Sequence, residues 1–337
     1  MLAVVGAGAM GTALAVQLHR AGNEVALLAT KYDDLFVEAH RRGEDHPAIG
    51  VPFPPAPLHT HDDWAGALSR CEAVVLAVST AGLITTVEEA AHHTGDDALW
   101  AVGTKGWDEK TLRSASSVVA DALGDEKRVV ALVGPSLAGE LAAGVPTALV
   151  FASADRANSA RVAAMFSSKG FRTYLSDDVA GVEVGAALKN VIAIGIGLCD
   201  GVAEAFTVET MNNAKAFIFA RGLIEMAELA RASGGRPETV IGLAGAGDLF
   251  VTALGGRNAR FGALVGGGTS PEDALKEMAT TVEGYVNGHA AVALADKHGL
   301  ASPVIRTVAR VIYDGFPPRE AIIDLIRSDG PHEESDL

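Results

Sequence analysis

The chain opens with a glycine motif placed between an apolar run and a helix-favouring run. Residues 2–5, Leu-Ala-Val-Val, lead directly into Gly-Ala-Gly-Ala-Met-Gly at 6–11, and the helix-favouring run covers 12–22. In this context Gly6 allows a tight turn, Gly8 lets a pyrophosphate approach the backbone, and Gly11 lets helix and strand pack closely. The phosphates would lie at the positive end of the helix dipole. The motif therefore predicts a dinucleotide-binding turn, and the alternative is a tight turn that binds nothing.

Composition narrows the classes of partner. The chain has 337 residues, 49% of them hydrophobic, so it can bury two cores. Its 27 basic and 42 acidic side chains give a formal net charge of -15. We therefore expect no nucleic-acid or anionic-membrane binding, because neutralising phosphates needs a basic face. Any bound anion must be held by a local cluster of donors.

Cysteine usage and apolar runs indicate the compartment. Cys71 and Cys199 are far apart and have no metal-ligand spacing, so we expect no disulfide framework, no metal site and a reducing compartment. The first predicted strand begins at Leu2, which leaves no room for a signal peptide. The longest apolar stretch, 191–199, is about half the length that spans a bilayer. These features predict a cytoplasmic protein.

Strand and helix patterns divide the chain into two parts. Strand-like runs lie at 2–5, 24–29, 73–78, 99–102, 129–133 and 147–152. From about Val179 onward the pattern is helical, at 182–198, 208–232, 271–278, 284–298 and 302–313. We predict an α/β fold, with a Rossmann-like, doubly wound parallel sheet as the dinucleotide-binding domain (1–178) and an all-helical substrate-binding and catalytic domain (179–327). Residues 328–337 read as a disordered acidic tail, and a ligand cleft is expected at the carboxyl edge of the sheet.

The end of the second predicted strand bears on the choice of cofactor. A carboxylate there would accept hydrogen bonds from the ribose 2′-hydroxyl and select NAD. This chain has Thr30 and Lys31, with Asp33 and Asp34 beyond them. Thr30 and Lys31 could donate to a 2′-phosphate, and nothing negative is expected at the strand end itself. The pattern favours NADP over NAD; the alternative reading makes Lys31 a solvated loop cation.

Two further turns follow predicted strands and carry polar groups. Thr-Lys-Gly at 104–106 places Lys105 at the carboxyl edge of the sheet, where ligands bind. Gly-Pro-Ser at 134–136 points Ser136 into the same region. Ser136 is not in the nucleophile motif of hydrolases, so it fits an anion or hydroxyl donor. Alternatively, Ser136 caps the helix that follows.

The helical part contains a lysine in an apolar segment. Residues 181–198 are apolar on nearly every helical face, yet include Glu183, Lys189 and Asn190. A lysine buried there must pair, lower its pKa or face a cleft. With a lowered pKa, Lys189 could take the proton of an alcohol as a hydride leaves carbon. The alternative is a structural pair with Glu183 or with an aspartate elsewhere.

Two glycine-dense segments follow, at 242–249 and 255–262. Glycines allow close backbone approach, and the guanidinium of Arg257 suits a phosphate. With Lys105 and Lys189, Arg257 would make a local cationic site for a small phosphorylated substrate. The alternative is two surface turns with a solvent-facing arginine.

These motifs resemble those of the NAD(P)-dependent sn-glycerol-3-phosphate dehydrogenases of bacteria and archaea. The resemblance rests on the segments at 5–15, 104–106, 134–136, 181–194, 242–249, 257–262 and 282–284, in order over nearly the whole chain. It implies hydride transfer between NAD(P)H and dihydroxyacetone phosphate. It also implies a cytoplasmic, often dimeric enzyme that supplies glycerol phosphate for phospholipids.

The resemblance also implies roles for individual residues. Lys189 would accept the C2 hydroxyl proton, with Asp248 and Asn190 beside it, and Lys105 would touch both cofactor and substrate. The remaining substrate contacts would be Gly134 and Ser136, and, for the phosphate, Gly256, Arg257 and Asn258. The remaining cofactor contacts would be Ala9 and Met10 over the pyrophosphate, then Ala138, Arg257 and Glu283.

The chain departs from the family pattern at several places. Met10 stands where many members have Trp, Thr30-Lys31 where bacterial members often have Arg, and Gly256 where Ser is common. Residues 202–213 also differ from the usual glycine-rich version. The last two departures leave open a related phosphorylated ketone as substrate. Two further alternatives are a reductase of a 2-keto acid, of the β-hydroxyacid or ketopantoate type, and a dinucleotide sensor without chemistry.

Overall fold

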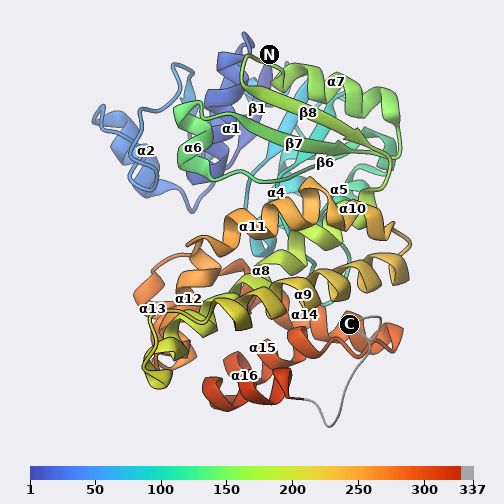
Figure 1. The fold of residues 1–337 in the computed structure, drawn as a ribbon. Helices are drawn as coiled ribbons and strands as arrows, with labels where there is room; N and C mark the ends of the chain where they lie inside the picture. Colours follow the sequence, from blue (N-terminus) through green and yellow to red (C-terminus); the bar gives the residue numbers. More distant parts are fainter. Residues whose placement is uncertain (328–337) are drawn as a thin grey trace. The chain divides into compact units, whose positions relative to one another are not determined.

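The computed structural model describes residues 1–327 and divides into two compact units (Figure 1). The first unit comprises Met1–Asp108 and Arg113–Val179, and the second comprises Glu109–Leu112 and, of the described residues, 180–327. The segment Glu109–Leu112 therefore belongs with the second unit although it lies far before it in the sequence. The predicted acidic tail, 328–337, lies outside the described residues.

An eight-stranded sheet in the order β3-β2-β1-β4-β5-β6-β7-β8 forms the centre of the first unit. The strands are β1 (Leu2–Val5), β2 (Val25–Leu28), β3 (Leu58–His59), β4 (Ala73–Leu76), β5 (Leu99–Val102), β6 (Val129–Val133), β7 (Thr147–Ala152) and β8 (Phe171–Ser176). Strand β1 lies between β2 and β4, and both pairs are parallel. The glycine turn after β1 thus lies at the sheet's carboxyl edge, between the ends of β2 and β4.

One pair of strands departs from the predicted parallel sheet. Strands β6 and β7 are antiparallel, whereas β7 and β8 are parallel. The helix between β6 and β7, α6 (Ala138–Ala143), has 6 residues and is about 9 Å long. Because β6 is about 17 Å long, α6 does not return the chain to the far end of the sheet. The sheet is therefore mostly parallel, and the expectation of a wholly parallel one was wrong at this pair.

Two strands were missed by the apolar-run criterion. Strand β3 has 2 residues, too few to form a recognisable run. Strand β8 is an edge strand whose burial pattern is mixed, with Arg172, Thr173 and Ser176 among its residues. An edge strand exposes more of its surface, so its sequence need not be apolar. Strands β2 and β4 also end earlier than the predicted runs 24–29 and 73–78.

Helices cover both faces of the sheet, as expected for a doubly wound fold. They are α1 (Ala9–Arg20), α2 (Asp34–Arg41), α3 (Trp64–Leu68), α4 (Thr80–Ala91), α5 (Ala115–Leu123), α6 and α7 (Arg156–Phe166). One buried cluster joins Leu2 and Val4 to residues of α1 and α7. The other joins Ala3 and Val5 to residues of α3, α4 and α5. Alternate residues of β1 therefore enter opposite cores, as the pleat of a strand requires.

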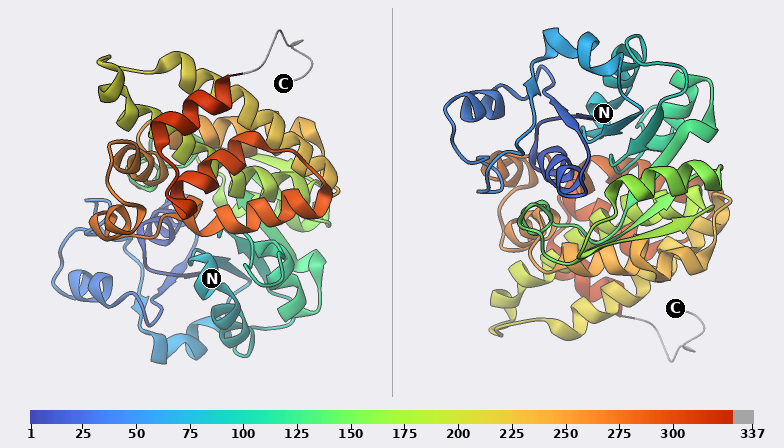
Figure 2. Two further views of the ribbon diagram at one scale, coloured as in Figure 1. Left: turned by 90° about the horizontal axis from the view of Figure 1, so that it is seen from below. Right: turned by 90° about the horizontal axis from the view of Figure 1, so that it is seen from above.

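The described part of the second unit is helical, so the predicted all-helical region is confirmed. Its helices are α8 (Val179–Val202), α9 (Asn212–Ala232), α10 (Pro237–Ile241), α11 (Asp248–Ala253), α12 (Arg257–Gly266), α13 (Pro271–Met278), α14 (Glu283–His298), α15 (Pro303–Asp314) and α16 (Pro318–Ile326). In both views of Figure 2 the yellow-to-red segments are helices, whereas the strands are blue to green.

Several boundaries in the second unit differ from the sequence prediction. Helix α9 begins at Asn212 rather than at 208, because a short 3-10 turn, Ala203–Phe206, is followed by Thr207 with a φ of 54°. A positive φ at a β-branched residue ends helical geometry. The two glycine-dense segments, for which surface turns were the alternative reading, contain a π-helical turn at Leu243–Gly247 and helices α11 and α12.

Helix α8 is the core of the second unit. The helical segment Val179–Phe206 has 28 residues and is long and apolar enough to cross a membrane, but its most apolar window is completely buried. The uninterrupted apolar stretch 191–199 is only part of this longer helix, which also contains Glu183, Lys189 and Asn190. Its burial identifies α8 as a core helix of a folded domain.

Glycines let α8 and α12 pack backbone against backbone. A Cβ added at Gly197 of α8 would lie 2.0 Å from the carbonyl oxygen of Ala259 in α12. A Cβ added at Gly262 of α12 would lie 2.2 Å from the carbonyl oxygen of Ile194 in α8. Neither contact tolerates a side chain. This close packing fixes the start of α12 relative to the middle of α8.

Candidate active site

The glycine turn between β1 and α1 is packed closely against backbone atoms at two of its three glycines. Gly6 has a φ of 106°, and a Cβ there would lie 2.7 Å from the carbonyl oxygen of Ala77. A Cβ on Gly11 would lie 1.9 Å from the carbonyl oxygen of Gly6. At Gly8, by contrast, an added Cβ would meet only Phe36, at 3.9 Å. The turn is therefore tight at Gly6 and Gly11 and open at Gly8, where a pyrophosphate needs to approach.

The start of α1 is suited to an anion. The helix begins at Ala9, its N-cap residue Gly8 provides no side-chain cap, and its first turn contains no acidic residue. The backbone N–H groups of a first helical turn have no partner within the helix, and the helix dipole favours negative charge there. Gly8, Ala9 and Met10 are each half-buried. This turn can hold a pyrophosphate.

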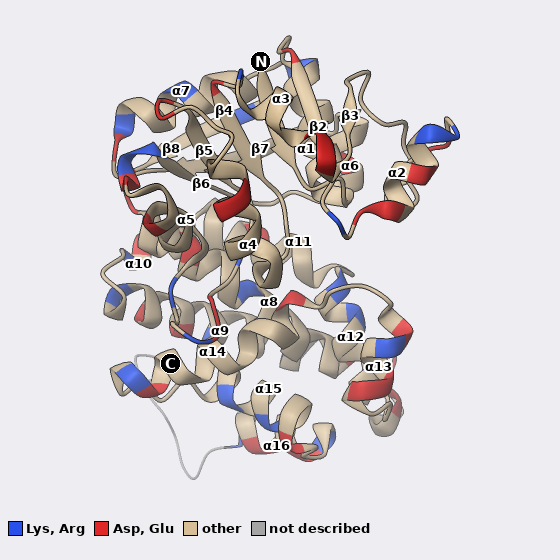
Figure 3. Cartoon of the chain, turned by 180° about the vertical axis from the view of Figure 1, so that it is seen from behind, with Lys and Arg blue, Asp and Glu red and all other residues tan. Residues whose placement is uncertain are grey.

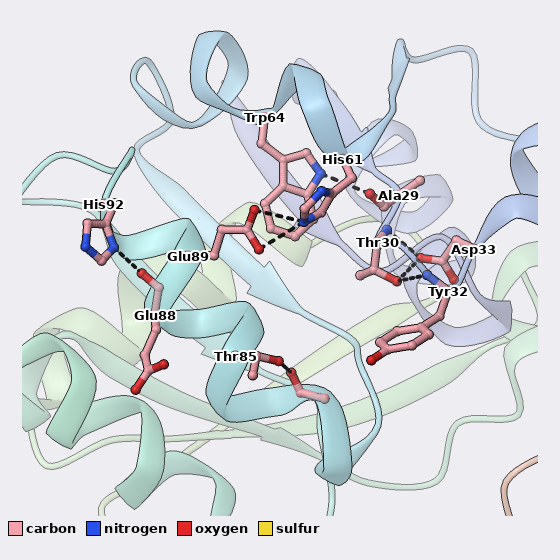
Figure 4. A network of polar contacts seen from close by, with 11 residues as sticks. Ala29, Thr30, Tyr32, Asp33, His61, Trp64, Thr85, Glu88, Glu89 and His92 are labelled. Atoms are coloured by element: carbon pink, nitrogen blue, oxygen red, sulfur yellow. Dashed lines mark hydrogen bonds and ion pairs between the residues drawn. The ribbon is translucent and has the colours of Figure 1, made fainter.

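A carboxylate lies at the end of β2, where none was expected (Figure 4). Oδ2 of Asp33 accepts hydrogen bonds from the Thr30 N–H at 2.7 Å and from the Thr30 hydroxyl at 2.8 Å. The same oxygen accepts the Ala7 N–H of the glycine turn at 3.0 Å. The chain turns sharply between β2 and α2, so a residue several positions beyond the strand folds back onto its end. The expectation of an uncharged strand end was wrong for this reason.

The two residues assigned to a 2′-phosphate differ in their surroundings. Thr30 already directs its N–H and its hydroxyl toward Asp33. Lys31 is exposed, and its ammonium lies 5.2 Å from the ring centre of Tyr32. Thr30 therefore stabilises the local turn, whereas Lys31 is an exposed cation on the loop.

The turns after β5 and β6 present Lys105 and Ser136. Lys105 is half-buried, and its carbonyl oxygen accepts the Thr80 hydroxyl at 3.1 Å. Ser136 is also half-buried, and its hydroxyl donates to the carbonyl oxygen of Gly134 at 3.1 Å. The N-cap of α6 is Leu137, with Ala138 as the first helical residue. Ser136 is therefore not the N-cap of α6, and its hydroxyl bonds within its own turn.

Lys189 and Asp248 form a buried ion pair in the second unit. Nζ of Lys189 lies 2.6 Å from Oδ1 of Asp248, and the two side chains are 7% and 1% exposed. The aspartate lies at the start of α11, directly after the π-helical turn. Of the alternatives left open by the sequence, the structure thus shows the pair with a distant aspartate. Burial of both charges makes each depend strongly on the other.

Thr252 completes this group and was not singled out in the sequence. Nζ of Lys189 donates to Oγ1 of Thr252 at 2.8 Å, and the Thr252 hydroxyl donates to the carbonyl oxygen of Asp248 at 2.7 Å. The only sequence signal was its position four residues after Asp248, which places both side chains on one side of a helix. Asp248 and Thr252 together hold the lysine nitrogen in one place.

Asn190 and Asn258 link three helices. The Asn258 side-chain amide donates to Oδ1 of Asn190 at 2.8 Å, and Oδ1 of Asn258 accepts the Gly284 N–H at 2.8 Å. Both asparagines are buried. These bonds connect the middle of α8 with the first turns of α12 and α14. They position the neighbours Lys189, Arg257 and Glu283 relative to one another.

Arg257 is the first residue of α12, and its side chain is exposed. Its N-cap residue Gly256 provides no side-chain cap. Glu283 is half-buried at the start of α14. Acidic and basic residues are otherwise interspersed over the chain (Figure 3). An exposed guanidinium beside an uncapped helix start can bind a phosphate.

Comparisons with known proteins agree over nearly the whole chain. Residues 1–159 match the family model for the N-terminus of NAD-dependent glycerol-3-phosphate dehydrogenase, and residues 178–323 match the model for its C-terminus. A glycerol-3-phosphate dehydrogenase [NAD(P)+] of Thiobacillus denitrificans is 38% identical over 328 residues, covering 96% of this chain and 97% of the relative. One from Symbiobacterium thermophilum is 37% identical over 335 residues, covering 98% and 95%.

Solved structures give the same result. The crystal structure of glycerol-3-phosphate dehydrogenase from Coxiella burnetii has a TM-score of 0.87 and 33% identity, and it covers 97% of this chain and 98% of its own. A ketopantoate reductase from Ralstonia eutropha, covering 97% of this chain and 100% of its own, has a TM-score of 0.58 and 17% identity, which shows a shared fold alone. Since both family models match in order and the relatives align from end to end, the chain belongs to the NAD-dependent glycerol-3-phosphate dehydrogenase family.

Proposed function

We propose that this protein interconverts sn-glycerol 3-phosphate and dihydroxyacetone phosphate with NAD(P)+ or NAD(P)H, and so supplies glycerol phosphate for phospholipid synthesis. The observation that carries the proposal is the buried group of Lys189, Asp248 and Thr252. The Lys189 ammonium beside the Asp248 carboxylate can donate a proton to the carbonyl oxygen of dihydroxyacetone phosphate, and the neutral amine that results can take a proton from the alcohol in the opposite direction. Family membership identifies the alcohol.

The first unit would hold the cofactor. The open side of Gly8 and the uncapped start of α1 fit a pyrophosphate. The nicotinamide group, when bound, accepts or gives the hydride. Ala9 and Met10 would cover the pyrophosphate, and the remaining cofactor contacts carried over from the family motifs are Lys105, Ala138, Arg257 and Glu283.

Lys189 would take the proton from the C2 hydroxyl of glycerol 3-phosphate as the hydride leaves C2. In the opposite direction the same nitrogen returns a proton to the new alkoxide oxygen. Asp248 stabilises the ammonium form that results from proton uptake, because its carboxylate oxygen lies 2.6 Å from Nζ. Thr252 keeps Nζ oriented by accepting one of its N–H groups. Asn190 would lie beside the substrate.

Arg257 would bind the substrate phosphate, together with the backbone at the start of α12. Gly256 has no hydroxyl, so the phosphate would depend more on the guanidinium and on the helix N–H groups than it would with a serine at this position. Asn258 contributes through its bonds to Asn190 and Gly284, which fix this helix start. Lys105, Gly134 and Ser136 are proposed as further substrate contacts by motif position.

We propose a cytoplasmic homodimer, in keeping with the family resemblance. Among the described residues, the one helix long and apolar enough to cross a membrane is buried, as the core helix of a folded protein is. The net charge of -15 fits a small-molecule enzyme rather than a nucleic-acid-binding protein.

The direct test follows the absorbance of NADH, and separately of NADPH, with dihydroxyacetone phosphate as substrate. Oxidation of either cofactor that depends on this substrate supports the proposal. Reduction of a 2-keto acid in its place, or cofactor binding without turnover on phosphorylated ketones, would overturn it.

A further inference from the structure

We infer that Asp33 determines the choice of dinucleotide, and that it selects NAD(H) over NADP(H). The inference deepens the proposed function, because it concerns the cofactor of that same site. It reverses the preference suggested by the residues Thr30 and Lys31 alone. It rests on where the Asp33 carboxylate lies and on which of its oxygens is occupied.

One oxygen of the carboxylate joins the glycine turn to the end of β2. Oδ2 of Asp33 accepts the N–H of Ala7 at 3.0 Å, and the N–H and hydroxyl of Thr30 at 2.7 and 2.8 Å. Ala7 lies between Gly6, where the turn is crowded, and Gly8, where it has free space. The carboxylate is therefore adjacent to the backbone that would hold the adenosine half of a dinucleotide.

The other oxygen remains available. Within residues 1–327, Oδ1 of Asp33 has no hydrogen-bond partner. This oxygen is not fully buried, although the residue as a whole is only 7% exposed. Oδ1 therefore keeps contact with solvent and can accept a hydrogen bond from a ribose hydroxyl. In dinucleotide-binding folds a carboxylate at the end of the second strand has this function.

The surrounding backbone is fixed on both sides. The indole N–H of Trp64 donates to the carbonyl oxygen of Ala29 at 3.0 Å, which holds the strand end (Figure 4). Nδ1 of His46 accepts the Ala48 N–H at 3.2 Å, so in the neutral ring Nε2 carries the proton and donates to the carbonyl oxygen of Ala7 at 3.0 Å. Asp33 and His46 thus hold the N–H and the C=O of the same residue. A carboxylate held in this way cannot swing aside for a larger ligand.

Charge then decides between the two cofactors. A 2′-phosphate carries about two negative charges and would place them next to the Asp33 carboxylate. Like charges at close range are unfavourable. The donors that could have offset this repulsion at Thr30 are already directed to Asp33. The exposed ammonium of Lys31 is screened by solvent and contributes little. A free 2′-hydroxyl, by contrast, gains an acceptor.

The test compares Asp33→Asn with Asp34→Asn. Asparagine at 33 keeps an oxygen for the Ala7 and Thr30 donors but removes the charge. Asp34 is the exposed neighbour, so the control loses the same charge one residue away. The dissociation constants of NADH and NADPH are measured by cofactor fluorescence, and kcat/KM is measured with dihydroxyacetone phosphate for each cofactor. Circular dichroism checks the fold.

We expect the parent protein to prefer NADH. Asp33→Asn should shift the ratio of kcat/KM for NADH to kcat/KM for NADPH toward NADPH by about tenfold or more. Asp34→Asn should leave this ratio within about twofold of the parent value. A parent that prefers NADPH overturns the inference. So does an Asp33→Asn variant that stays folded with an unchanged ratio, or that loses both cofactors equally, since Asp33 would then only support the turn. The fluorescence measurement needs no substrate, so failure of the proposed reaction and failure of this inference are separately visible.

Discussion

Nζ of Lys189 lies 2.6 Å from Oδ1 of Asp248, and these two buried residues are 59 positions apart in the sequence. The pair places an amine and a carboxylate together inside a helical core. It also makes the two side chains interdependent, since removing one leaves a buried charge without its partner. Experiments on this site must therefore separate lost chemistry from lost folding.

Replacing Lys189 with Ala should abolish turnover while cofactor binding remains nearly unchanged. Loss of a general base typically costs about 10² to 10⁴ in rate, and the glycine turn belongs to the other unit. The measurements are kcat with dihydroxyacetone phosphate and the dissociation constant of NADH. The exposed Lys276→Ala variant serves as control.

Lys189→Arg separates the two effects. Arginine keeps the positive charge opposite Asp248 but does not lose a proton near neutral pH. We expect a folded protein with a similarly low kcat. Near-normal turnover in either variant would rule out proton transfer by Lys189.

Replacing Arg257 with Ala should lower kcat/KM for dihydroxyacetone phosphate by ~30-fold or more, because a charge-assisted contact to a phosphate is lost. Arg257→Lys should recover only part of the loss, since an ammonium lacks the planar fork. Arg231→Ala, at an exposed arginine in the same unit, is the matched control. Full efficiency in Arg257→Ala would mean that the phosphate binds elsewhere.

Gly262→Ala should destabilise the protein by about 1–3 kcal/mol, the usual cost of overpacking. The new methyl group would lie 2.2 Å from the carbonyl oxygen of Ile194 and force α12 away from α8. The control is Gly66→Ala, where an added Cβ meets nothing within 4 Å and where alanine should stabilise α3 by about 0.5–1 kcal/mol. Urea unfolding and Tm measure both. Equal stabilities of the two variants would contradict the close packing of α8 on α12.

His46 should make stability depend on pH. Burial lowers the pKa of His46 below its ordinary value of 6.5, against the opposing effect of its bond to Ala7. Between the two pKa values the unfolded chain binds more protons, so the free energy of unfolding falls as pH is lowered from about 6.5. Above that pH the neutral ring contributes its full stabilisation.

His46→Gln should reduce this pH dependence below about pH 6.5, whereas His92→Gln, at an exposed histidine, should not. The measurement is the free energy of unfolding from urea titrations at several pH values. A parent protein and a His46→Gln variant with parallel pH profiles would show that His46 is not the group responsible.

Much of the fold could be predicted from short segments of the sequence. The order Leu2–Val5, glycine turn, α1 follows from an apolar run, three glycines and a helix-favouring segment, each readable within a dozen residues. The long apolar segment around Lys189 predicted a buried helix and a lysine that must pair or face a cleft. Strand β8 could not be predicted in this way, because its mixed sequence is explained only by its place at an edge of the sheet. The antiparallel direction of β7 could not be predicted either, because it depends on the shortness of α6.

The site divides in the same way. Sequence by itself determined the glycine turn, the buried lysine and the family motifs, because local periodicity and residue type decide which groups are flexible, apolar or charged. Only the tertiary structure decided that Lys189 pairs with Asp248, and that Asp33 bonds to Ala7 across 26 positions. Such partners are set by hydrogen-bond directions and distances of a few ångströms between elements that meet only after folding. The carboxylate of Asp33, which lies beyond the strand end in the sequence, therefore lies against the glycine turn between β1 and α1 in the folded chain.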